Sequence, residues 1–378
     1  MPHFTLPNYS ELTDSQREIL NLPGGKNHVV TGAPGTGKSV LAVYRASDMH
    51  KAGMKVLLLV YNKPLMLYIS SAVDELGLNA DVKTWNSWIS SFYNEHFGHK
   101  PPDILGIPFT FDWERIKQDF QSIGAHYDHI IIDEAQDFPI ELIEALRIIS
   151  SGISCFMDEN QTIADNHTTY QDAVMALNVP TKHTLHENFR NPKEIFDFAK
   201  LYSNGGNLAE PIHSINHKPE MVKCISFSTD ELISKMVGYI RNQMCGCRSI
   251  GVFVKPQSVE STYDELNLCL NRHDDPDVFR YSAMAHTDVD FDKDGVFVLS
   301  FGTMKGLEFD GVLIPKFERI KSRNDKKLDR NIIYVATTRA SKELVCFYNN
   351  DFVTPNHIDI FSPLAGHKNV LKWRGVNE

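Results

Sequence analysis

The chain has 378 residues, of which 42% are hydrophobic and 23% are charged. At roughly 150 residues per domain, this length predicts two or three domains, each large enough to bury its own core. The composition is that of ordinary globular proteins and excludes long disordered or collagen-like stretches. Acidic residues outnumber basic ones by 48 to 38, giving a formal charge of −10. This charge excludes a histone-like basic coat, but it still allows a local positive groove that binds nucleic acid.

The sequence has no feature typical of a secreted or membrane protein. The segment Met1 to Glu11 lacks a basic stretch followed by an apolar core, so no signal peptide is expected. Apolar runs such as Val56–Tyr61 have the length of a strand rather than of a membrane span. Of the six cysteines, only Cys245 and Cys247 are close together, without a second pair or a His cluster at zinc spacing. We therefore expect a cytoplasmic protein with reduced thiols and no membrane partner.

Short β-branched runs alternate with amphipathic stretches, which predicts an α/β fold with parallel sheets. In chain order, the expected strands are His28–Thr31, Lys55–Tyr61, His129–Asp133, Ser154–Asp158, Ser249–Val254, Gly295–Phe301, Asp310–Pro315 and Glu343–Asn349. The expected helices include Lys38–His50, Glu141–Ile149, Glu231–Asn242 and Lys327–Thr338. Loops are expected at Gly98–Pro108, Ser203–Pro219 and His273–Asp294. The polar stretch around Thr181–His186 separates two groups of strands, so we expect domains at residues 1–186 and 187–378.

A phosphate-binding loop follows the first expected strand. The residues Gly32, Ala33, Pro34, Gly35, Thr36, Gly37, Lys38 and Ser39 fit the pattern G-x-x-x-x-G-K-[ST] and open a helix. Gly35 and Gly37 allow the backbone to turn its N–H groups toward phosphate oxygens, and the helix N-terminus faces the anion. Lys38 is expected to reach the β- and γ-phosphates, and the Ser39 hydroxyl to bind Mg²⁺. The loop therefore predicts nucleotide binding.

A pair of carboxylates follows the third expected strand. Asp133 is expected to hold Mg²⁺, directly or through water, and Glu134 to take a proton from the attacking water. Acidic residues at this place could instead only cap a helix. Beside a phosphate loop, the two carboxylates favour hydrolysis over passive binding.

With Asp133-Glu134-Ala135-Gln136 in view, the chain resembles superfamily 1 helicases of the UvrD/Rep type. Further matches occur in the order of the family along nearly the whole chain. They are Leu12–Gln16, Tyr61–Lys63, Thr84–Trp85, Asp158–Gln161, Glu187–Arg190, Thr303–Asp310 and Tyr334–Ala340. The resemblance implies two RecA-like P-loop domains with parallel sheets, with the nucleotide in the cleft between them, and ATP and Mg²⁺ as cofactors.

The resemblance also implies a role for each matched position. Gln16 would bind the adenine edge, Gln161 would sense the γ-phosphate, and Glu308 would meet the ribose. Phe189 would stack on the base, while Arg190 and Arg339 would reach the γ-phosphate. Tyr61–Lys63 and Thr84–Trp85 look like the motifs that touch single-stranded DNA.

The chain departs from the family pattern in three places. Only about forty residues separate Trp88 from Ile130, enough for a small insertion at about 89–125, and the large second insertion is missing. The stretch after Gln161 has no Trp to stack on DNA, unless Tyr170 or His167 replaces it. The usual His upstream of Lys305 is also missing, since Ser300–Thr303 stands there instead. These departures leave ATP hydrolysis as expected but put processive unwinding in doubt.

Two functions remain open from the sequence. The first is an ATP-dependent DNA helicase or single-stranded-DNA translocase, an ATP hydrolase that acts on single-stranded or partly duplex DNA. The alternative is a DNA-stimulated ATPase switch or sensor within a larger complex, in repair or anti-phage defence, with a protein partner and little unwinding. A nucleotide-binding protein without turnover would leave Glu134 and both arginines idle. The basic stretch Lys316–Lys327 is typical of a solvated loop, although it could serve as a phosphate track.

Overall fold

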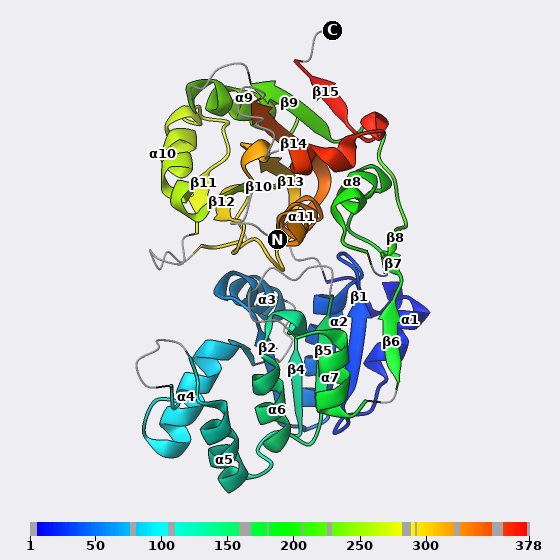
Figure 1. Ribbon diagram of the computed structural model, residues 1–378, viewed down its shortest axis with the longest axis vertical. Coiled ribbons are helices and arrows are strands. Elements are labelled where there is room, and N and C mark those ends of the chain that lie inside the picture. The colour runs from blue at the N-terminus through cyan, green and yellow to red at the C-terminus, as the bar shows by residue number, and fades with distance from the viewer. Residues whose placement is uncertain are drawn as a thin grey trace. The chain divides into compact units, whose positions relative to one another are not determined.

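The computed structural model describes residues 6–75, 81–104, 110–158, 168–179, 181–205, 208–224, 229–281, 289–291, 293–320, 326–349 and 358–375. It divides into two compact units (Figure 1). The N-terminal unit comprises Thr5–Ala33 and Gly37–His186, and the C-terminal unit comprises Glu187–Glu378 with Pro34–Thr36. No helix in the described ranges is long and apolar enough to cross a membrane.

The N-terminal unit is built on a six-stranded parallel sheet in the order β3-β2-β4-β5-β1-β6. Its strands are β1 (His28–Gly32), β2 (Val56–Val60), β3 (Val82–Thr84), β4 (His129–Ile132), β5 (Ile153–Met157) and β6 (Lys182–Leu185). Its helices are α1 (Asp14–Leu20), α2 (Lys38–Lys51), α3 (Lys63–Glu75), α4 (Trp85–Phe97), α5 (Trp113–Ile123), α6 (Ile140–Ile148) and α7 (Tyr170–Leu177).

Helices cover both faces of this sheet, which explains why β4 and β5 are mostly apolar and are buried along their whole length. One core cluster joins alternate strand residues to α4, α5, α6 and α7. Helices α2 and α3 contact the strands without contributing to that cluster, so they lie against the opposite face. The segment at about 89–125, expected as an insertion, forms most of α4 and α5. Its aromatic residues, such as Phe92 and Phe120, pack in the same core as the sheet.

The C-terminal unit has a seven-stranded parallel sheet in the order β11-β12-β10-β13-β14-β9-β15. Its strands are β9 (Glu220–Cys224), β10 (Ser249–Val254), β11 (Val278–Arg280), β12 (Gly295–Ser300), β13 (Phe309–Ile314), β14 (Ala340–Asn349) and β15 (Lys372–Arg374), and β7 (Glu187–Asn188) pairs with β8 (Glu210–Pro211). Its helices are α8 (Lys193–Ala199), α9 (Thr229–Asn242), α10 (Val259–Cys269), α11 (Lys326–Thr337) and α12 (Ile358–Phe361). Helices α9 and α10 share one core cluster with the sheet.

The predicted fold class is confirmed, because both large sheets are parallel and alternate with helices. Each expected strand and helix is present, with bounds that differ by a few residues. The stretch Thr181–His186, expected only to separate two groups of strands, is itself largely strand β6, paired with β1. Two expected loops also contain strands: β11 lies within His273–Asp294 and β8 within Ser203–Pro219.

A buried arginine on α2 fastens the chain that precedes the phosphate loop. Arg45 is only 1% exposed, and its guanidinium donates to the Leu22 carbonyl at 2.7 Å and to the Ile19 carbonyl at 3.2 Å. Its Nε donates to the Ser154 hydroxyl on β5 at 3.1 Å. Burial lowers the pKa of Arg45 to about 10, so the side chain is still a cation at neutral pH. Arg45 therefore connects the end of α1 to the central sheet.

Replacing Arg45 with Met should lower the free energy of unfolding by about 3 kcal/mol or more, because buried carbonyls lose their donors. Urea unfolding followed by circular dichroism measures this change. The matched control is Arg17→Met on α1, where an exposed arginine pairs with Asp14 at 3.1 Å. That change should stay within about 0.5 kcal/mol. Equal effects of the two substitutions would contradict the anchoring role of Arg45.

Candidate active site

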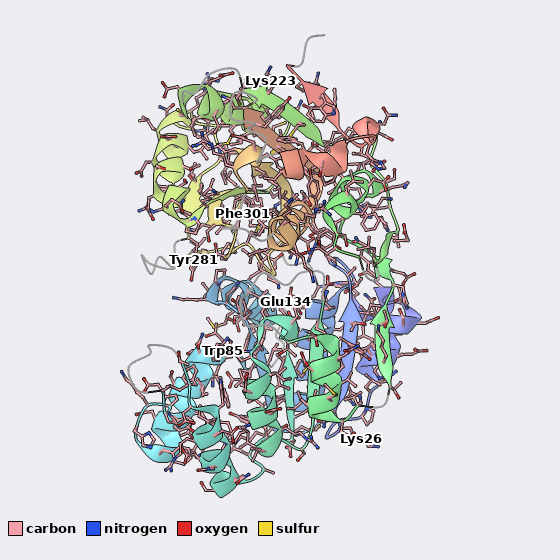
Figure 2. All side chains as sticks on the ribbon, in the orientation of Figure 1. Lys26, Trp85, Glu134, Lys223, Tyr281 and Phe301 are labelled. Carbon is pink, nitrogen blue, oxygen red and sulfur yellow. The ribbon has the colours of Figure 1, made fainter. Side chains whose placement is uncertain are left out.

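The candidate site of the N-terminal unit lies where its parallel strands end. The phosphate loop follows β1, Asp133 and Glu134 follow β4, and Asp158 follows β5. Because all strands run the same way, these segments meet at one edge of the sheet. Figure 2 labels Glu134 and Trp85 at this edge and Lys26, which precedes β1, at the other.

The phosphate loop has the backbone geometry that its glycines were expected to provide. Gly35 and Gly37 have φ values of 75° and 86°, and Gly37 directly precedes α2. The buried Lys38 side chain folds back over the loop, and its Nζ donates to the carbonyls of Gly32 at 2.8 Å and Ala33 at 3.0 Å. An ammonium and a helix N-terminus thus face the same loop, an arrangement suited to phosphate.

Gln16 lies beside the phosphate loop, although it also has a local structural role. Its Oε1 accepts the Thr13 N–H at 3.0 Å, which completes a capping box at the start of α1. Its Nε2 is so close to Gly37 that a Cβ added there would lie 2.8 Å from it. The structure therefore brings Gln16 and the loop together, and adenine binding by Gln16 stays a prediction.

Asp133 and Ser39 offer oxygen ligands for a divalent cation. Asp133 is fully buried, and its Oδ1 accepts the N–H of Glu134 at 3.0 Å. Its Oδ2 has no hydrogen-bond partner among the described residues. Burial and the Glu134 carboxylate raise the pKa of Asp133 to about 7, while the Ser39 hydroxyl and the Lys38 ammonium act in the opposite direction. A buried carboxylate oxygen without a donor, near a hydroxyl, fits Mg²⁺.

The described part of the chain shows no metal site built from a cluster of His, Cys, Asp or Glu side chains. No group of three or more His, Cys, Asp or Glu side chains there could hold a metal ion. Cys245 and Cys247 are free cysteines, the first exposed and the second half-buried.

Glu134 has an unusual backbone conformation, and its side chain is bound by a neighbour that sequence analysis did not single out. It is buried and has φ 54° and ψ 43°, a left-handed conformation that costs about 1–3 kcal/mol for a non-glycine residue. The Gln136 Nε2 donates to Glu134 Oε2 at 2.5 Å, and Gln136 Oε1 accepts the Asp158 N–H at 2.9 Å. One fully buried amide therefore connects the carboxylate after β4 with the segment after β5. In the sequence, Gln136 could have been identified by its position in the motif Asp133-Glu134-Ala135-Gln136.

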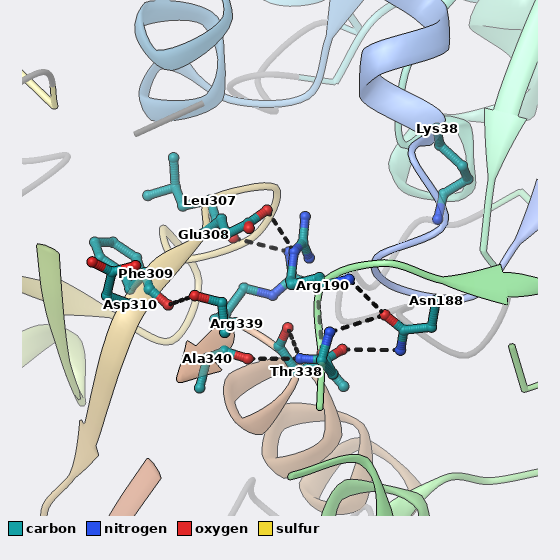
Figure 3. Close-up of polar contacts among 12 residues, drawn as sticks. Lys38, Asn188, Arg190, Leu307, Glu308, Phe309, Asp310, Thr338, Arg339 and Ala340 are labelled. Carbon is teal, nitrogen blue, oxygen red and sulfur yellow. Dashed lines mark hydrogen bonds and ion pairs between the residues drawn. The ribbon is translucent and has the colours of Figure 1, made fainter. Parts of the chain in front are cut away.

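In the C-terminal unit, the residues expected near the nucleotide gather around Glu308. The Arg190 Nε donates to Glu308 Oε2 at 2.7 Å (Figure 3), so the carboxylate expected to meet a ribose is paired with an arginine in this structure. The Arg190 side chain is 16% exposed and that of Glu308 is 31% exposed. Arg190 and Glu308 are thus brought together, although 118 residues separate them.

Arg339 is more deeply buried than expected for an arginine that reaches a γ-phosphate. It is 1% exposed, and its guanidinium donates to the carbonyls of Val335 at 3.0 Å and Leu307 at 3.2 Å. Asn191, which sequence analysis did not single out, donates to the carbonyls of Thr338 at 3.0 Å and Ala340 at 2.8 Å. This amide therefore fixes the turn that carries Arg339 to the segment that carries Arg190.

The residues expected to touch single-stranded DNA lie at the ends of β2 and β3, at the same edge as the phosphate loop. Asn62 Oδ1 accepts the Leu65 N–H at 2.8 Å, and Thr84 caps α4. Trp85 is half-buried against Phe111, with ring centroids 5.8 Å apart. Tyr170 was expected as a possible replacement for the missing Trp. Its ring centroid lies 4.8 Å from Lys182 Nζ.

The roles of several expected positions stay predictions. Gln161 and His167 lie outside the described residues. Phe189 is half-buried and its stacking role stays a prediction, as do the roles of Tyr61–Lys63.

The motif-bearing parts of both units match known family models. Residues 25–218, just over half of the chain, match the model described as Schlafen group 3, DNA/RNA helicase domain. The chain belongs to this family. Residues 295–346 match the UvrD-like helicase C-terminal domain, a range that includes Glu308 and Arg339. These matches confirm the resemblance to UvrD/Rep-type helicases. No curated protein is similar enough to the chain to count as a match.

Solved structures of helicases resemble the Schlafen-type chain at low identity. The C-terminal domain of a possible DNA helicase from Lactobacillus plantarum WCFS1 is 16% identical, with a TM-score of 0.35 and coverage of 49% of this chain and 98% of that one. The arterivirus nonstructural protein 10 (helicase) is 13% identical, with a TM-score of 0.42 and coverage of 92% of this chain. The match spans 63% of the arterivirus protein, less than two thirds of its length.

Proposed function

We propose that this chain is an ATP-dependent helicase or single-strand translocase driven by Mg-ATP hydrolysis. The observation that carries the proposal is the buried Asp133–Glu134 pair beside the phosphate loop, with one carboxylate oxygen unpartnered and the other carboxylate held by Gln136. Family membership supports nucleic acid as the partner, and we propose DNA with single-stranded or partly duplex structure. We also propose residues 1–186 and 187–378 as the two RecA-like domains.

In this mechanism each side chain has one task. Lys38 and the loop N–H groups bind the phosphates, and Gln16 binds the adenine edge. Ser39 and Asp133 would hold Mg²⁺, which neutralises charge on the phosphate oxygens when bound. Glu134, oriented by Gln136, takes a proton from the attacking water.

Residues outside this cluster complete the mechanism. Gln161 senses the γ-phosphate, and Arg190 and Arg339 stabilise the negative charge that develops there. Phe189 and Glu308 contact the base and the ribose. Loss of the γ-phosphate would then change the contacts of the C-terminal unit with the nucleotide, which couples hydrolysis to motion.

The first test is ATPase activity measured alone, with single-stranded DNA and with single-stranded RNA, followed by strand displacement on partly duplex substrates. Stimulation together with displacement supports the helicase. Stimulation without displacement supports the alternative, an ATPase switch within a larger complex. A protein without ATPase activity under all three conditions would contradict both.

Gln136→Glu should lower kcat by about 10²-fold at neutral pH while leaving KM for ATP nearly unchanged. The substituted carboxylate still accepts the Asp158 N–H, but it puts a second negative group against Glu134 and raises the pKa of the pair. Because the base must be deprotonated, activity should recover as the pH rises. Steady-state ATPase rates from pH 6 to 9.5 measure this shift. Gln121→Glu on α5 is the exposed control, and an unchanged pH profile for Gln136→Glu would contradict the positioning role.

A further inference from the structure

A closed ring of contacts joins three segments of the C-terminal unit, each of which carries part of a matched motif. One side of the ring is formed by Leu307, Glu308 and Phe309, which each contact an arginine. The Leu307 carbonyl accepts from the Arg339 guanidinium at 3.2 Å, and the Phe309 N–H donates to the Arg339 carbonyl at 3.0 Å. Between these two residues, Glu308 pairs with Arg190 at 2.7 Å. One short segment therefore contacts both arginines.

Asn191 closes the ring on the other side. It directly follows Arg190 in the chain. Its Nδ2 donates to the carbonyls of Thr338 at 3.0 Å and Ala340 at 2.8 Å, the two residues that flank Arg339 in the sequence. Asn191 is 0% exposed, so water cannot replace these hydrogen bonds when the amide is removed. The backbone on both sides of Arg339 is thus fixed by the residue next to Arg190.

A second buried asparagine fixes the orientation of the Asn191 amide. Asn188 Oδ1 accepts the backbone N–H groups of Arg190 and Asn191, each at 3.0 Å, so its amide nitrogen points away from them. That nitrogen donates to Asn191 Oδ1 at 3.2 Å. Because the Asn191 oxygen is used in this way, both hydrogens of its Nδ2 are directed to the two carbonyls. An aspartate at this position would keep the shape but would have no donor for either carbonyl.

The position of the Arg339 guanidinium depends on this ring. Arg339 is only 1% exposed and donates to buried carbonyls, so the location of its guanidinium follows that of the backbone turn. A fully satisfied network of buried polar groups makes the segments that it joins rigid. In catalysis, a misplacement of about 1 Å can cost roughly 10²-fold in rate. A rigid ring that contains both arginines is therefore suited to placing them at one phosphate group.

We propose that Asn191 is a positioning residue that places the Arg339 guanidinium in register with that of Arg190. The proposal rests on the proposed function, because it takes both arginines as the groups that stabilise charge at the γ-phosphate. Asn191 itself is buried, so its effect passes through the turn that carries Arg339. Its loss should therefore lower the rate of hydrolysis while nucleotide affinity stays the same.

The experiment measures phosphate release and ADP affinity of the full chain at a temperature well below the thermal midpoint of each variant. Asn191→Asp should lower kcat roughly 10²-fold, with KM for ATP and affinity for ADP close to those of the parent. Asn191→Ala, which adds no charge, should show the same pattern and decides the question if the aspartate prevents folding.

Tyr202→Phe is the matched control for a loss of stability alone. The buried Tyr202 hydroxyl lies in the same unit and donates to the Ile360 carbonyl at 2.9 Å. Its removal should lower the thermal midpoint by a few degrees, as loss of a buried hydrogen bond does, while kcat stays at the parent value.

A double substitution tests whether Asn191 acts through Arg339. The kcat of Asn191→Asp/Arg339→Ala should lie within about threefold of that of Arg339→Ala, because the turn that Asn191 fixes then carries no guanidinium. Losses that multiply would overturn the proposal, since Asn191 would then act independently of Arg339.

The other contrary results differ in what else they affect. Parent-like kcat in Asn191→Asp and Asn191→Ala, with Arg339→Ala impaired, would overturn the positioning role and leave the proposed function intact. A raised KM with unchanged kcat would do the same. Full activity of Arg339→Ala would overturn both the role of Arg339 and its positioning by Asn191. Absence of ATPase activity in the parent would overturn the proposed function and the positioning role together.

Discussion

Glu134→Gln should bind ATP and fail to hydrolyse it, with kcat reduced by a factor of roughly 10² or more. Glutamine keeps the shape of the side chain and can take the same backbone conformation, but its amide cannot accept the proton of the attacking water. The Gln136 amide would still find an oxygen acceptor at this position. Binding of a fluorescent ATP analogue and steady-state release of phosphate measure the two properties separately.

Lys38→Ala provides the contrast. It removes the ammonium that lies over the phosphate loop, so both affinity and turnover should fall. Glu141→Gln on α6 is the exposed control and should hydrolyse ATP as the parent does. Hydrolysis at the parent rate by Glu134→Gln would mean that another group is the base.

The geometry of the candidate nucleotide site could be predicted from the sequence because its determinants are local. A phosphate loop needs a strand, a glycine-rich turn and a helix within about a dozen residues, and that context surrounds Gly32–Ser39. The carboxylates likewise follow a fully buried strand, β4, whose last three residues are isoleucines. In both places the residues that bind and the elements that position them are adjacent in the chain.

The elements that were missed depend on tertiary pairing. Strand β6 has the sequence Lys-His-Thr-Leu and is an edge strand, so it needs no apolar run of its own and is defined by pairing with β1. Strands β3, β11 and β15 are three residues each, too short for a periodic pattern to identify.

The long-range contacts of several site side chains also could not be predicted from the sequence. The contacts of Gln136 with Glu134 are made within a turn, yet its second contact, with Asp158, joins two strands. Asn191 contacts residues 147 and 149 positions away. The burial of Arg339 beneath the carbonyls of Val335 and Leu307 follows from how α11 meets the start of β13, which no local pattern contains.

The two arginines should have the largest effect on turnover. We expect Arg190→Ala and Arg339→Ala each to lower kcat by about 10³-fold or more while leaving affinity for ADP nearly unchanged, since ADP has no γ-phosphate. Lysine should restore little activity at either position, because a point charge does not reproduce the forked guanidinium. Phosphate release and ADP titration measure the two quantities.

The different contacts of Arg190 and Arg339 allow a loss of catalysis to be distinguished from a loss of stability. Arg339 donates to buried carbonyls, so Arg339→Ala should also lower the free energy of unfolding, by about 1–3 kcal/mol. Arg190 is more exposed and pairs with Glu308, and Arg190→Ala should therefore lose activity with a much smaller loss of stability. Thermal and urea unfolding of both variants separate these effects. A fully active Arg190→Ala would show that the C-terminal unit does not complete the catalytic site, whereas loss of activity in a stably folded Arg190→Ala assigns its guanidinium to the reaction.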